Sequence, residues 1–555
     1  MTTLKLTAFY LCILFVSVPN VFSQSGKNSY SKEFDILLTN LFSVQSPGGT
    51  VLVAKEGRIL YQKAFGKANL ELNAEMKPDY LFRIGSITKQ FTACAILKLS
   101  EEGRLSLQDS ITRFIKDYPT HGYTITIEHL LTHTSGIKNL TSMPAWNTDF
   151  RKKNITPAEL VNFFKNEPID FVPGQAFRYS NSNYILLGYI IELASGKTYE
   201  QYLNDSFFKP LGMQHTFADN SGRLIPDRVA GYQKIDENFT NADYLSMTQP
   251  YAAGSLLSNV QDLYTWYTAV MNYKVIGQKS LEKAHTPYRL SNGRLTGYGY
   301  GWHIGNIQGS KSIRHDGLIN GFTTSSLYLP KEKVFVAIFS NCEGTYDLDN
   351  TVSKIAAVAI DKPYQWEKIS LSSIDLASYE GVYKSETEGE RIIAYEDTRL
   401  VVYSKGGGKA ELVPYAKDRF YLSNQLATLE FAKDITTDSC SFILQSIGTP
   451  VFWKRTKKNV QKYSAILLSV EALKRYTGAY QFVPEFVITI TLEGNTLYGK
   501  ATGRGQMKQE ILPYAPDKFF AKNLDATLTF TLNEQGVITG MILFQNGEKK
   551  AQKIN

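Results

Sequence analysis

An internal repeat occupies the last third of the chain and restricts how that part can fold. Residues 379–383 (YEGVY) recur as residues 476–480 (YTGAY). Residues 412–420 (LVPYAKDRF) recur as residues 511–519 (ILPYAPDKF), and the offset between the copies is 97 to 99 residues. A repeat of this length, present twice, predicts one small domain followed by a second of the same fold.

The composition of each copy predicts β-structure. Beyond Pro363 helical periodicity disappears and short alternating segments replace it. In residues 486–493, large apolar residues alternate with Val, Thr, Thr and Glu, which is the pattern of a half-buried strand. A small antiparallel sheet hides its unpaired edges by closing into a barrel. We therefore predict two small antiparallel, lipocalin-like β-barrels at residues 370–457 and 465–555.

The region before Pro363 mixes strand and helix patterns. A chain of 555 residues is too long for one ordinary core and predicts roughly two to four domains. Strand-like runs stand near both ends of this region, at residues 50–65 and 322–340, with helical periodicity between them. This order predicts an α+β domain over residues 30–363, with an antiparallel sheet flanked by helices. The predicted helices cover residues 86–102, 156–165, 183–194 and 348–360.

The first 23 residues have the form of a secretory signal. Lys5 supplies the positive start, residues 6–18 are apolar, and residues 21–23 (VFS) form a cleavage site. The apolar run is too short to span a bilayer comfortably, so we expect cleavage of residues 1–23 rather than an N-terminal anchor. The mature chain is therefore predicted to be exported, to the periplasm or the medium, without stable membrane insertion.

Charge and ligand-forming residues argue against several classes of function. The net charge of +8 is spread along the chain without a Lys/Arg-rich tract, which gives nucleic-acid binding no support. The 7 His residues show no paired ligand spacing, and Cys94, Cys342 and Cys440 lie in separate segments. We therefore expect neither a metal nor a cofactor, and we interpret each of these Cys residues as a small buried hydrophobe.

A Ser–Lys pair begins the first predicted helix. Ser86 and Lys89 are spaced so that their side chains share one helix face, a turn apart. A serine hydroxyl becomes nucleophilic when a neighbouring base takes its proton, and a lysine can be that base if its pKa is lowered. The spacing alone has low specificity, because it recurs in the chain. Other SxxK matches are Ser29/Lys32, Ser135/Lys138, Ser206/Lys209 and Ser280/Lys283.

Three motifs in order make the pattern specific. Residues 82–92 (FRIGSITKQFT) resemble the nucleophile helix of the serine β-lactamase/penicillin-binding family. Residues 179–181 (YSN) and 315–317 (HDG) are similar to that family's Tyr-Xaa-Asn and His-Xaa-Gly elements. The resemblance covers roughly residues 35–360 and implies the family's fold and an acyl-enzyme reaction. Further similar segments are residues 129–137 (HLLTHTSGI), 210–213 (PLGM), 253–256 (AGSL) and 298–302 (YGYGW).

The resemblance implies the roles of the proton-transfer groups. Ser86 attacks a carbonyl and becomes acylated, while Lys89 and Tyr179 share its proton as general base and acid. A lysine cation beside Tyr179 is expected to lower the pKa of that phenol. His133 and Ser135 are expected to hold a turn beneath the site rather than to react.

The resemblance also implies the groups that bind the substrate. Asn181 would hold the lysine and the substrate amide, and His315 would orient the tyrosine or the substrate. The backbone N–H of Leu318 would form an oxyanion hole with that of the nucleophile. Asp316 and Gly317 complete the predicted substrate-binding residues.

The His-Asp-Gly element bears on the substrate. β-Lactam-binding members of the family present Lys and a hydroxyl there, and these engage the ligand carboxylate. Here His315 is mostly neutral at pH 7, and Asp316 would repel a carboxylate if it faced the cleft. Both features argue against an efficient β-lactamase.

The order of domains resembles that of D-stereospecific aminopeptidases of the same family, in which a barrel loop restricts the cleft to small substrates with a free amine. Asp316 would bind such an amine unless strand alternation turns it away. We therefore expect a small-molecule or short-peptide substrate, cleaved at an amide, peptide or ester bond. A carboxylesterase or DD-peptidase-like hydrolase with weak β-lactam interaction, and a non-catalytic penicillin-binding-like sensor, remain alternatives.

Overall fold

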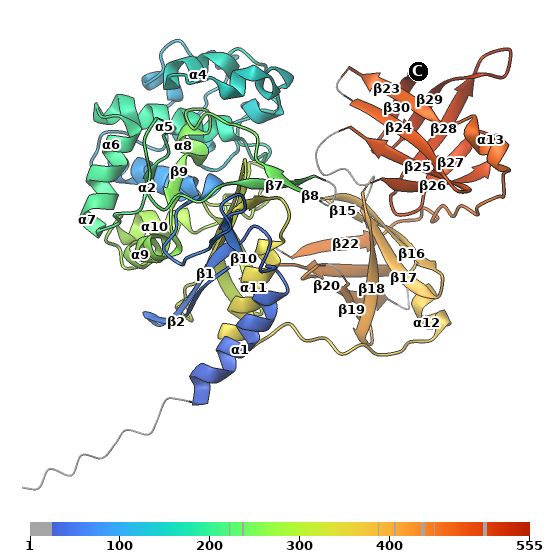
Figure 1. Ribbon diagram of the computed structural model, residues 1–555, viewed down its shortest axis with the longest axis horizontal. Coiled ribbons are helices and arrows are strands. Elements are labelled where there is room, and N and C mark those ends of the chain that lie inside the picture. The colour runs from blue at the N-terminus through green and yellow to red at the C-terminus, as the bar shows by residue number, and fades with distance from the viewer. Residues whose placement is uncertain are drawn as a thin grey trace, which may run out of the picture.

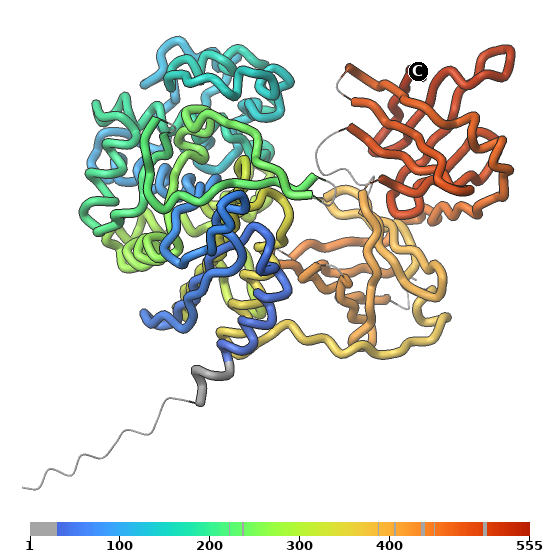
Figure 2. The backbone as a smooth tube through the Cα atoms, in the orientation of Figure 1, coloured from blue at the N-terminus to red at the C-terminus, as the bar shows by residue number. Residues whose placement is uncertain are grey.

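The structure is a computed structural model that describes residues 25–554, except residues 221, 236–237, 387, 405–406, 424, 435–438, 449, 485 and 503–507. The predicted signal sequence at residues 1–23 lies outside the described residues. Figures 1 and 2 show an N-terminal α+β domain beside two β-barrels. Within the described part of the chain, no helix combines the length and the apolar character that a membrane span requires.

A six-stranded antiparallel sheet joins the two ends of the N-terminal domain, in the order β10–β11–β12–β13–β1–β2. β1 (Gly49–Lys55) pairs with β2 (Arg58–Phe65) on one side and with β13 (Val334–Ser340) on the other. All seven residues of β13 are buried, because the strand lies inside the sheet and both of its faces are covered. The predicted α+β fold is confirmed. The other strands are β10 (His303–Ile307), β11 (Ser310–Ile319) and β12 (Phe322–Leu329).

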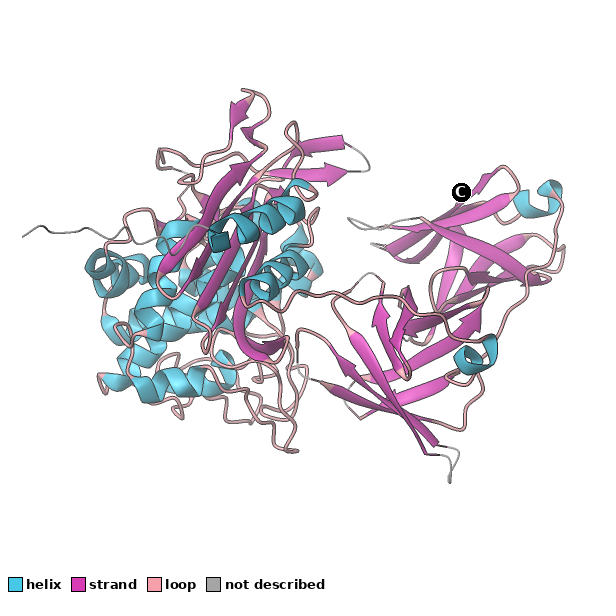
Figure 3. Cartoon of the chain, turned by 90° about the horizontal axis from the view of Figure 1, so that it is seen from below, coloured by secondary structure: helices cyan, strands magenta, loops and turns pink. Residues whose placement is uncertain are grey.

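Helices cover both faces of this sheet (Figure 3). On one face, α1 (Ser25–Thr39) and α11 (Leu348–Ala359) pack on alternate residues of the central strands. On the other face lies a larger apolar core built around α2 (Thr88–Glu101) and α5 (Asn181–Ser195). Alternate side chains of each strand therefore enter one of two separate cores. Two further helices of the larger core are α8 (Tyr251–Gly254) and α9 (Val260–Met271).

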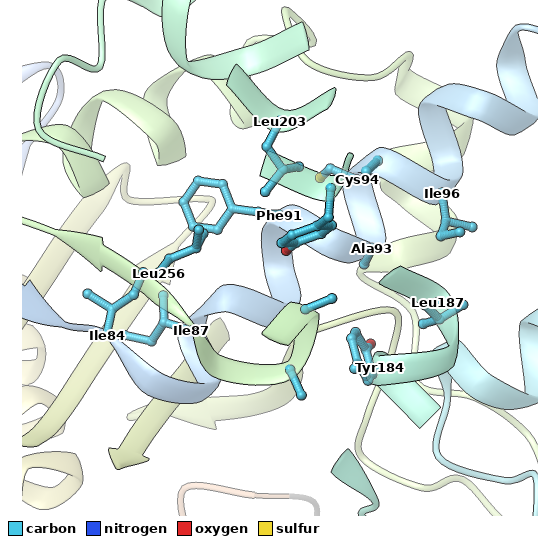
Figure 4. Close-up of a cluster of buried hydrophobic side chains, with 14 of the residues drawn as sticks. Ile84, Ile87, Phe91, Ala93, Cys94, Ile96, Tyr184, Leu187, Leu203 and Leu256 are labelled. Carbon is cyan, nitrogen blue, oxygen red and sulfur yellow. The ribbon is translucent and has the colours of Figure 1, made fainter. Parts of the chain in front are cut away.

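Helix α2 is enclosed on all sides, which distinguishes it from an ordinary amphipathic surface helix. Its Phe91 ring, labelled in Figure 4, stacks on Trp266 with centroids 4.1 Å apart. Several polar side chains of α2 are also buried, and Gln90 and Thr92 donate hydrogen bonds within the core. Gln90 donates to the Tyr267 hydroxyl at 2.8 Å, and Thr92 donates to the Ala252 carbonyl at 2.7 Å.

The shorter elements connect these layers. The remaining helices are η1 (Gly85–Ile87), η2 (Ile111–Arg113), α3 (Ile127–Leu131), η3 (Leu140–Ser142), η4 (Pro144–Asn147), η5 (Asp149–Lys152), α4 (Pro157–Phe164), α6 (Tyr199–Leu203), η6 (Asn204–Phe208), α7 (Lys209–Leu211) and α10 (Gln278–Ala284). The small sheets contain β3 (Lys67–Asn69), β4 (Ala74–Glu75), β5 (Phe82–Arg83), β6 (Phe217–Ala218), β7 (Tyr232–Ile235), β8 (Asn238–Asn241), β9 (Leu256–Ser258) and β14 (Cys342–Glu343).

Two closed antiparallel barrels, β15 to β22 and β23 to β30, follow the N-terminal domain and confirm the predicted architecture. The first contains β15 (Gly381–Ser385), β16 (Gly389–Glu396), β17 (Arg399–Ser404), β18 (Lys409–Ala416), β19 (Arg419–Leu422), β20 (Thr428–Asp434), β21 (Ser439–Gln445) and β22 (Val451–Arg455). The second contains β23 (Gly478–Val483), β24 (Phe486–Glu493), β25 (Thr496–Ala501), β26 (Gln509–Ala515), β27 (Lys518–Ala521), β28 (Thr527–Leu532), β29 (Ile538–Phe544) and β30 (Glu548–Ile554).

A short helix precedes each barrel, which the sequence patterns did not predict. These helices are α12 (Ser373–Ala377) and α13 (Val470–Lys474), and each is five residues long. A helix of this length is too short to show a periodicity in the sequence. In both, a serine side chain just before the helix accepts a hydrogen bond from a backbone N–H of the first turn.

The sequence repeat is also a repeat of hydrogen bonds. Tyr379 donates to Asp418 Oδ1 at 2.7 Å in the first barrel, and Tyr476 donates to Asp517 Oδ1 at 2.8 Å in the second. In both barrels the aspartate has a positive φ, and the strand before it is irregular at the Pro-Tyr-Ala segment. The repeated residues therefore anchor the short entry segment of each barrel to the same strand-connecting turn.

The first barrel contacts the N-terminal domain at the edge of the large sheet. The Asn306 N–H in β10 donates to the Ile447 carbonyl at 3.2 Å, and Ile447 packs against the core beneath α1 and α11. The barrels contact each other where the Lys409 N–H donates to the Asn523 carbonyl at 3.1 Å. The loop at Ile447 thus covers an otherwise unpaired sheet edge.

Three cysteines lie in the described part of the chain. Cys94, Cys342 and Cys440 are buried and carry free thiols, in agreement with their interpretation as small hydrophobes. In the described part of the chain, no group of three or more His, Cys, Asp or Glu residues is placed to hold a metal ion.

The two tyrosine–aspartate hydrogen bonds are expected to contribute equally to the stability of their barrels. We expect Tyr379→Phe and Tyr476→Phe each to lower the free energy of unfolding of their own barrel by about 1–3 kcal/mol, because each removes a hydrogen bond to a carboxylate. Differential scanning calorimetry measures the change, and Tyr123→Phe, at an exposed tyrosine, is the matched control. A loss no larger than that of the control would contradict the anchoring role.

Candidate active site

The nucleophile candidate lies where a strand turns into the enclosed helix. Ser86 stands in the 3-10 turn η1, and α2 begins at Thr88 rather than at the serine as predicted. Lys89 follows one turn later, and its Nζ lies 2.9 Å from Ser86 Oγ. The structure therefore brings the two groups of the Ser-Xaa-Xaa-Lys motif within hydrogen-bond distance.

Lys89 is fully buried, although lysine is seldom found in that position. Besides Ser86 Oγ, its Nζ contacts Asn181 Oδ1 at 2.9 Å and the Ala253 carbonyl at 2.7 Å. Burial lowers the pKa of Lys89 well below its ordinary value, while the negative charge of Asp316 opposes this shift. The amine is therefore disposed to be neutral, as a general base must be.

The three contacts of Lys89 direct its lone pair. A neutral amine has two hydrogens and one lone pair, and the oxygens of Asn181 and Ala253 can only accept hydrogens. If those two oxygens take the two N–H bonds, the lone pair is left for the third neighbour, the Ser86 hydroxyl. This arrangement allows the hydroxyl proton to move from Ser86 Oγ to Lys89 Nζ.

Tyr179 lies beside the same amine. The Lys89 nitrogen lies 4.8 Å from the centroid of the Tyr179 ring. The Tyr179 hydroxyl has no hydrogen-bond partner among the described residues, although the nearby Ser86 hydroxyl tends to lower its pKa. Burial outweighs that effect and raises the pKa of Tyr179 well above its ordinary value. The expected lowering of this pKa is therefore wrong, because the neighbouring amine is itself buried and disposed to be neutral.

Asn181 is placed by an earlier helix start than predicted. α5 begins at Asn181, two residues before the predicted start at residue 183, so the side chain projects from the first turn toward α2. Its backbone N–H donates to Asn139 Oδ1 at 3.0 Å. The helix start therefore fixes the amide that contacts Lys89.

His315 is buried in β11 and has a defined tautomer. Its Nδ1 lies 2.7 Å from the Asp316 carbonyl, which only accepts, so Nδ1 carries the proton. Its Nε2 lies 3.0 Å from the Tyr298 hydroxyl, which must then be the donor. Burial lowers the pKa of His315 well below its ordinary value, and the nearby His303 and Lys89 act in the same direction. The ring is therefore disposed to be neutral, and its centroid lies 6.2 Å from that of the Tyr179 ring.

Two residues near His315 were missed as site residues. Tyr298 contacts both His315 and the edge of the Tyr179 ring, with ring centroids 6.2 Å apart in the second case. His303, in a second His-Xaa-Gly segment at residues 303–305, lies with its ring centroid 5.2 Å from that of His315. The signal for Tyr298 was present in residues 298–302 (YGYGW), but local sequence cannot show which of its aromatic rings faces the site.

The turn that contains His133 and Ser135 packs beneath these groups. The His133 ring lies 4.3 Å from the Tyr179 ring, and its Nδ1 accepts the Ser180 N–H at 3.1 Å. Ser135 donates to Asn183 Oδ1 at 2.6 Å. Both residues are fully buried and hold the segment between Tyr179 and α5.

Glycines allow β11 to approach the nucleophile turn. A Cβ on Gly317 would lie 2.1 Å from the Ile84 carbonyl oxygen and 2.5 Å from Thr324 Oγ1. Gly85 has φ +50°, and a Cβ there would lie 3.1 Å from the Leu318 nitrogen. Any side chain at residue 317 would push the strand away from the turn, so Gly317 has a steric role.

The Leu318 N–H points to the same turn. Opposed residues of an antiparallel pair alternate between those that exchange hydrogen bonds and those that do not. Ile319 and Phe322 close the two-residue hairpin loop between β11 and β12, so the next pair, Leu318 and Thr323, does not exchange them. The Leu318 N–H therefore faces the open side of β11, next to η1, where it can form an oxyanion hole with the Ser86 N–H.

Asp316 lies on the other face of β11. It shares that face with Arg314, whose Nη1 lies 3.0 Å from Asp349 Oδ2 in α11. Ser325, opposite Asp316 in β12, donates to Asp349 Oδ1 at 2.6 Å. Strand alternation thus turns Asp316 toward α11, which corrects the expectation that it contacts the substrate. Its charge nevertheless raises the pKa of Lys89 and of Tyr179.

A small pocket opens beside Ser86. Its cavity volume is about 110 Å³, and its walls come from the nucleophile turn, the segment 140–146, the start of α5, the segment 245–254 and the end of β11. None of the described residues that line it is charged. His315 and Asp316 are not among them.

The close approach of β11 predicts the effect of filling it. We expect Gly317→Ala to lower kcat for an activated ester by about 10²–10³-fold, because a shifted β11 removes the Leu318 N–H from the oxyanion position. Circular dichroism checks that the variant folds. Gly408→Ala, where an added Cβ meets nothing within 4 Å, is the control. Unchanged kcat in folded Gly317→Ala would show that the approach is not needed.

Comparison with known sequences places the N-terminal domain in a family. The family model described as Beta-lactamase matches residues 34–359, and a model described as a domain of unknown function matches residues 464–555. Penicillin-binding protein 4* of Bacillus subtilis (strain 168) is 30% identical over 457 residues, which cover 78% of this chain and 100% of that protein. The putative penicillin-binding protein PbpX of the same strain is 32% identical and covers 55% of this chain and 74% of its own length.

Solved structures show the same relationship. The octameric penicillin-binding protein homologue from Pyrococcus abyssi has a TM-score of 0.54 and 27% identity, over 78% of this chain and 99% of that one. A D-stereospecific amidohydrolase from Streptomyces sp. has a TM-score of 0.52 and 25% identity, over 59% of this chain and 97% of that one. The match spans more than half of the chain and includes the Ser86, Tyr179 and His315 motifs, and the protein therefore belongs to the beta-lactamase family.

Proposed function

We propose that this protein is an exported serine hydrolase that forms an acyl-enzyme on Ser86 with small, uncharged ester, amide or peptide substrates. The observation that carries the proposal is the buried Lys89 amine, 2.9 Å from Ser86 Oγ and with a lowered pKa. Such an amine is costly to bury and is of use where a hydroxyl must lose its proton. Export rests on the signal-like residues 1–23.

Acylation starts with a proton transfer. Ser86 Oγ attacks the substrate carbonyl carbon as its proton moves to Lys89 Nζ, and the carbonyl oxygen becomes an oxyanion. The N–H groups of Ser86 and Leu318 stabilise that charge. The bond to the leaving group then breaks, and the leaving group takes the proton from Lys89 through the Tyr179 hydroxyl.

Tyr179 acts in this scheme as a protonated relay. Because burial raises its pKa, the phenol keeps its proton at neutral pH and can donate it while receiving another from Lys89. Its hydroxyl has no other hydrogen-bond partner among the described residues, so it is available to the leaving group. Water then attacks the acyl-enzyme along the reverse path and restores Ser86.

The pocket favours uncharged substrates. None of its described lining residues carries a charge that could pair with a carboxylate, and burial lowers the pKa of His315. β-Lactams and D-alanyl-D-alanine peptides carry a carboxylate, so weak reaction with them is expected. The similarity to a D-stereospecific amidohydrolase supports amide cleavage, including a D-aminopeptidase-like activity. All described residues that line the pocket lie between residues 85 and 320. The pocket therefore gives no evidence for a barrel loop that enters the cleft.

Two other functions are compatible with the same family. A carboxylesterase is favoured by the uncharged pocket, since an ester needs no ionic partner. A non-catalytic sensor would use the same groups to become acylated without turnover. These functions differ in which substrates the protein turns over.

We expect p-nitrophenyl acetate and the uncharged N-acetyl-D-alanine p-nitroanilide to be hydrolysed by the wild-type protein, and both reactions to be lost in Ser86→Ala. Release of p-nitrophenol and p-nitroaniline is followed by absorbance. Ester turnover without anilide turnover would favour the carboxylesterase. Stoichiometric acylation without turnover would favour the sensor, and activity that survives in Ser86→Ala would refute the proposal.

The buried amine also predicts the pH dependence of acylation. The reactive form of Lys89 is the neutral amine, and its pKa is lowered. The rate of the p-nitrophenol burst should therefore be constant above that lowered pKa and fall as the pH drops through it. Lys89→Met should abolish the burst. A rate that instead increases only near the ordinary lysine pKa would mean that the amine is charged in the folded protein.

A further inference from the structure

Two buried hydroxyl groups of β12 connect the sheet to the segment that carries Ser86. Thr324 Oγ1 donates to the Ile84 carbonyl at 3.0 Å, directly before the nucleophile turn η1. Ser326 lies two residues further along β12, on the same face of the strand, and it is linked to α2 by a chain of hydrogen bonds. Both side chains are fully buried. The strand β12 therefore holds the nucleophile segment on both sides of Ser86.

The chain of hydrogen bonds runs from α2 through α9 to β11. Gln90, which follows Lys89 in α2, donates from Nε2 to the Tyr267 hydroxyl at 2.8 Å. The Tyr267 hydroxyl lies 3.2 Å from Ser326 Oγ, which in turn donates to the His315 carbonyl at 3.3 Å. The four linked side chains are at most 1% exposed, so water does not compete for these hydrogen bonds.

The two ends of this chain determine the direction of every hydrogen bond in it. An amide nitrogen only donates, and a carbonyl oxygen only accepts. The Tyr267 hydroxyl therefore accepts from Gln90 and donates to Ser326, and Ser326 donates to the His315 carbonyl. With the Gln90 amide reversed, one of the three contacts would lack a hydrogen. A single arrangement thus satisfies the whole chain, which makes the spacing between α2 and β11 specific.

Packing holds the Tyr267 ring independently of its hydroxyl. The centroid of the ring lies 5.0 Å from that of Phe335 in β13 and 6.1 Å from that of Tyr328 in β12. Burial raises the pKa of Tyr267 to about 12, so the phenol is uncharged near neutral pH. The hydroxyl can therefore be removed by substitution with Phe while the ring keeps its packing and no charge changes.

The spacing between α2 and β11 bears on the reaction because the two N–H groups that we assign to the oxyanion hole lie on different elements. The Ser86 N–H belongs to η1, which leads into α2, and the Leu318 N–H belongs to β11. The three hydrogen-bond contacts of Lys89 Nζ come from η1, α5 and α8 instead. A shift between α2 and β11 therefore disturbs the oxyanion hole and leaves the contacts of the amine intact.

We propose that Tyr267 is a positioning residue for acylation, whose hydroxyl holds α2 at the distance from β11 at which the N–H groups of Ser86 and Leu318 meet one carbonyl oxygen. Tyr267 is not among the residues that line the pocket, and it acts through Gln90 and Ser326. This inference rests on the proposed acylation of Ser86 and extends it to a residue in the core behind the site.

The test compares two Tyr→Phe variants in the p-nitrophenol burst from p-nitrophenyl acetate. Tyr267→Phe breaks the chain at its centre. Tyr61→Phe is the matched control, because it removes a buried hydroxyl that donates to Asp35 in the core on the other face of the sheet. We expect the burst rate constant of Tyr267→Phe to fall about 5- to 20-fold with an unchanged substrate dissociation constant, since a displaced oxyanion donor weakens binding of the transition state only. Tyr61→Phe should keep the wild-type rate.

The pH dependence of the burst separates positioning from a general loosening of the core. In Tyr267→Phe the plateau of the rate should fall, while the pH at which the rate drops should stay that of the wild type, because the contacts of Lys89 remain. A loosened core would admit water to Lys89 and raise its pKa toward the ordinary value. A shift of the acid limb to higher pH would therefore overturn the positioning role.

A second variant breaks the chain at another point. Ser326→Ala should lower the burst rate by a factor similar to that of Tyr267→Phe. The double variant should be no slower than the slower single variant, because both substitutions interrupt the same chain. Multiplied losses in the double variant would overturn the proposal. Thermal denaturation of each variant checks the fold, and Ser326→Ala decides by the same criteria if Tyr267→Phe does not fold.

The inference and the proposed function fail in different ways. A wild-type burst rate in folded Tyr267→Phe, or an equal loss in Tyr61→Phe, would overturn the positioning role and leave the chain a structural feature of the core. The proposed function would survive both results, provided that Ser86→Ala abolishes the burst. A wild-type protein without a burst that depends on Ser86 would overturn the proposed function, and the inference with it.

Discussion

The site depends on one buried amine. Lys89 lies in a helix enclosed by the large core, and three oxygens from three different elements surround its nitrogen: Ser86 Oγ, Asn181 Oδ1 and the Ala253 carbonyl. A charged amine in this position would be strongly penalised, so burial itself produces the base. The same contacts join η1, α5 and α8 around α2. Lys89 therefore links the packing of these elements to the chemistry of the site.

The second constraint is the distance between β11 and the nucleophile turn. Gly317 and Gly85 allow backbone to meet backbone, and the hairpin register turns the Leu318 N–H toward the turn. Successive residues of β11 point to opposite faces of the sheet. His315 therefore lies on the face that carries Tyr298 and the larger core, and Asp316 lies on the face that carries α11. His315 is buried and disposed to be neutral, which leaves a pocket whose described lining residues carry no charge. The preference for uncharged substrates that we propose follows from this lack of charge.

The barrels were predictable to an unusual degree because their sequence is repeated. The tyrosines and aspartates that recur in the two copies make the same hydrogen bond in each barrel. The sequence repeat therefore corresponds to one contact that forms twice. The short helices α12 and α13 were not predictable, since five residues show no periodicity. The contact of Ile447 with the edge strand β10 was not predictable either, because the local sequence of a loop does not indicate which distant strand the loop will contact.

The sequence by itself determined the fold class, the order of the three folded units and the identity of the Ser86, Lys89 and Tyr179 motifs, because periodicity, repetition and short-range spacing are local properties of a chain. It could not determine the charge state of those groups. The lowered pKa of Lys89 and the raised pKa of Tyr179 arise from burial, and burial is decided by segments far apart in the chain. The face of β11 on which Asp316 lies and the contact of Tyr298 with His315 likewise depend on which distant segments pack together, and only the tertiary structure decided them.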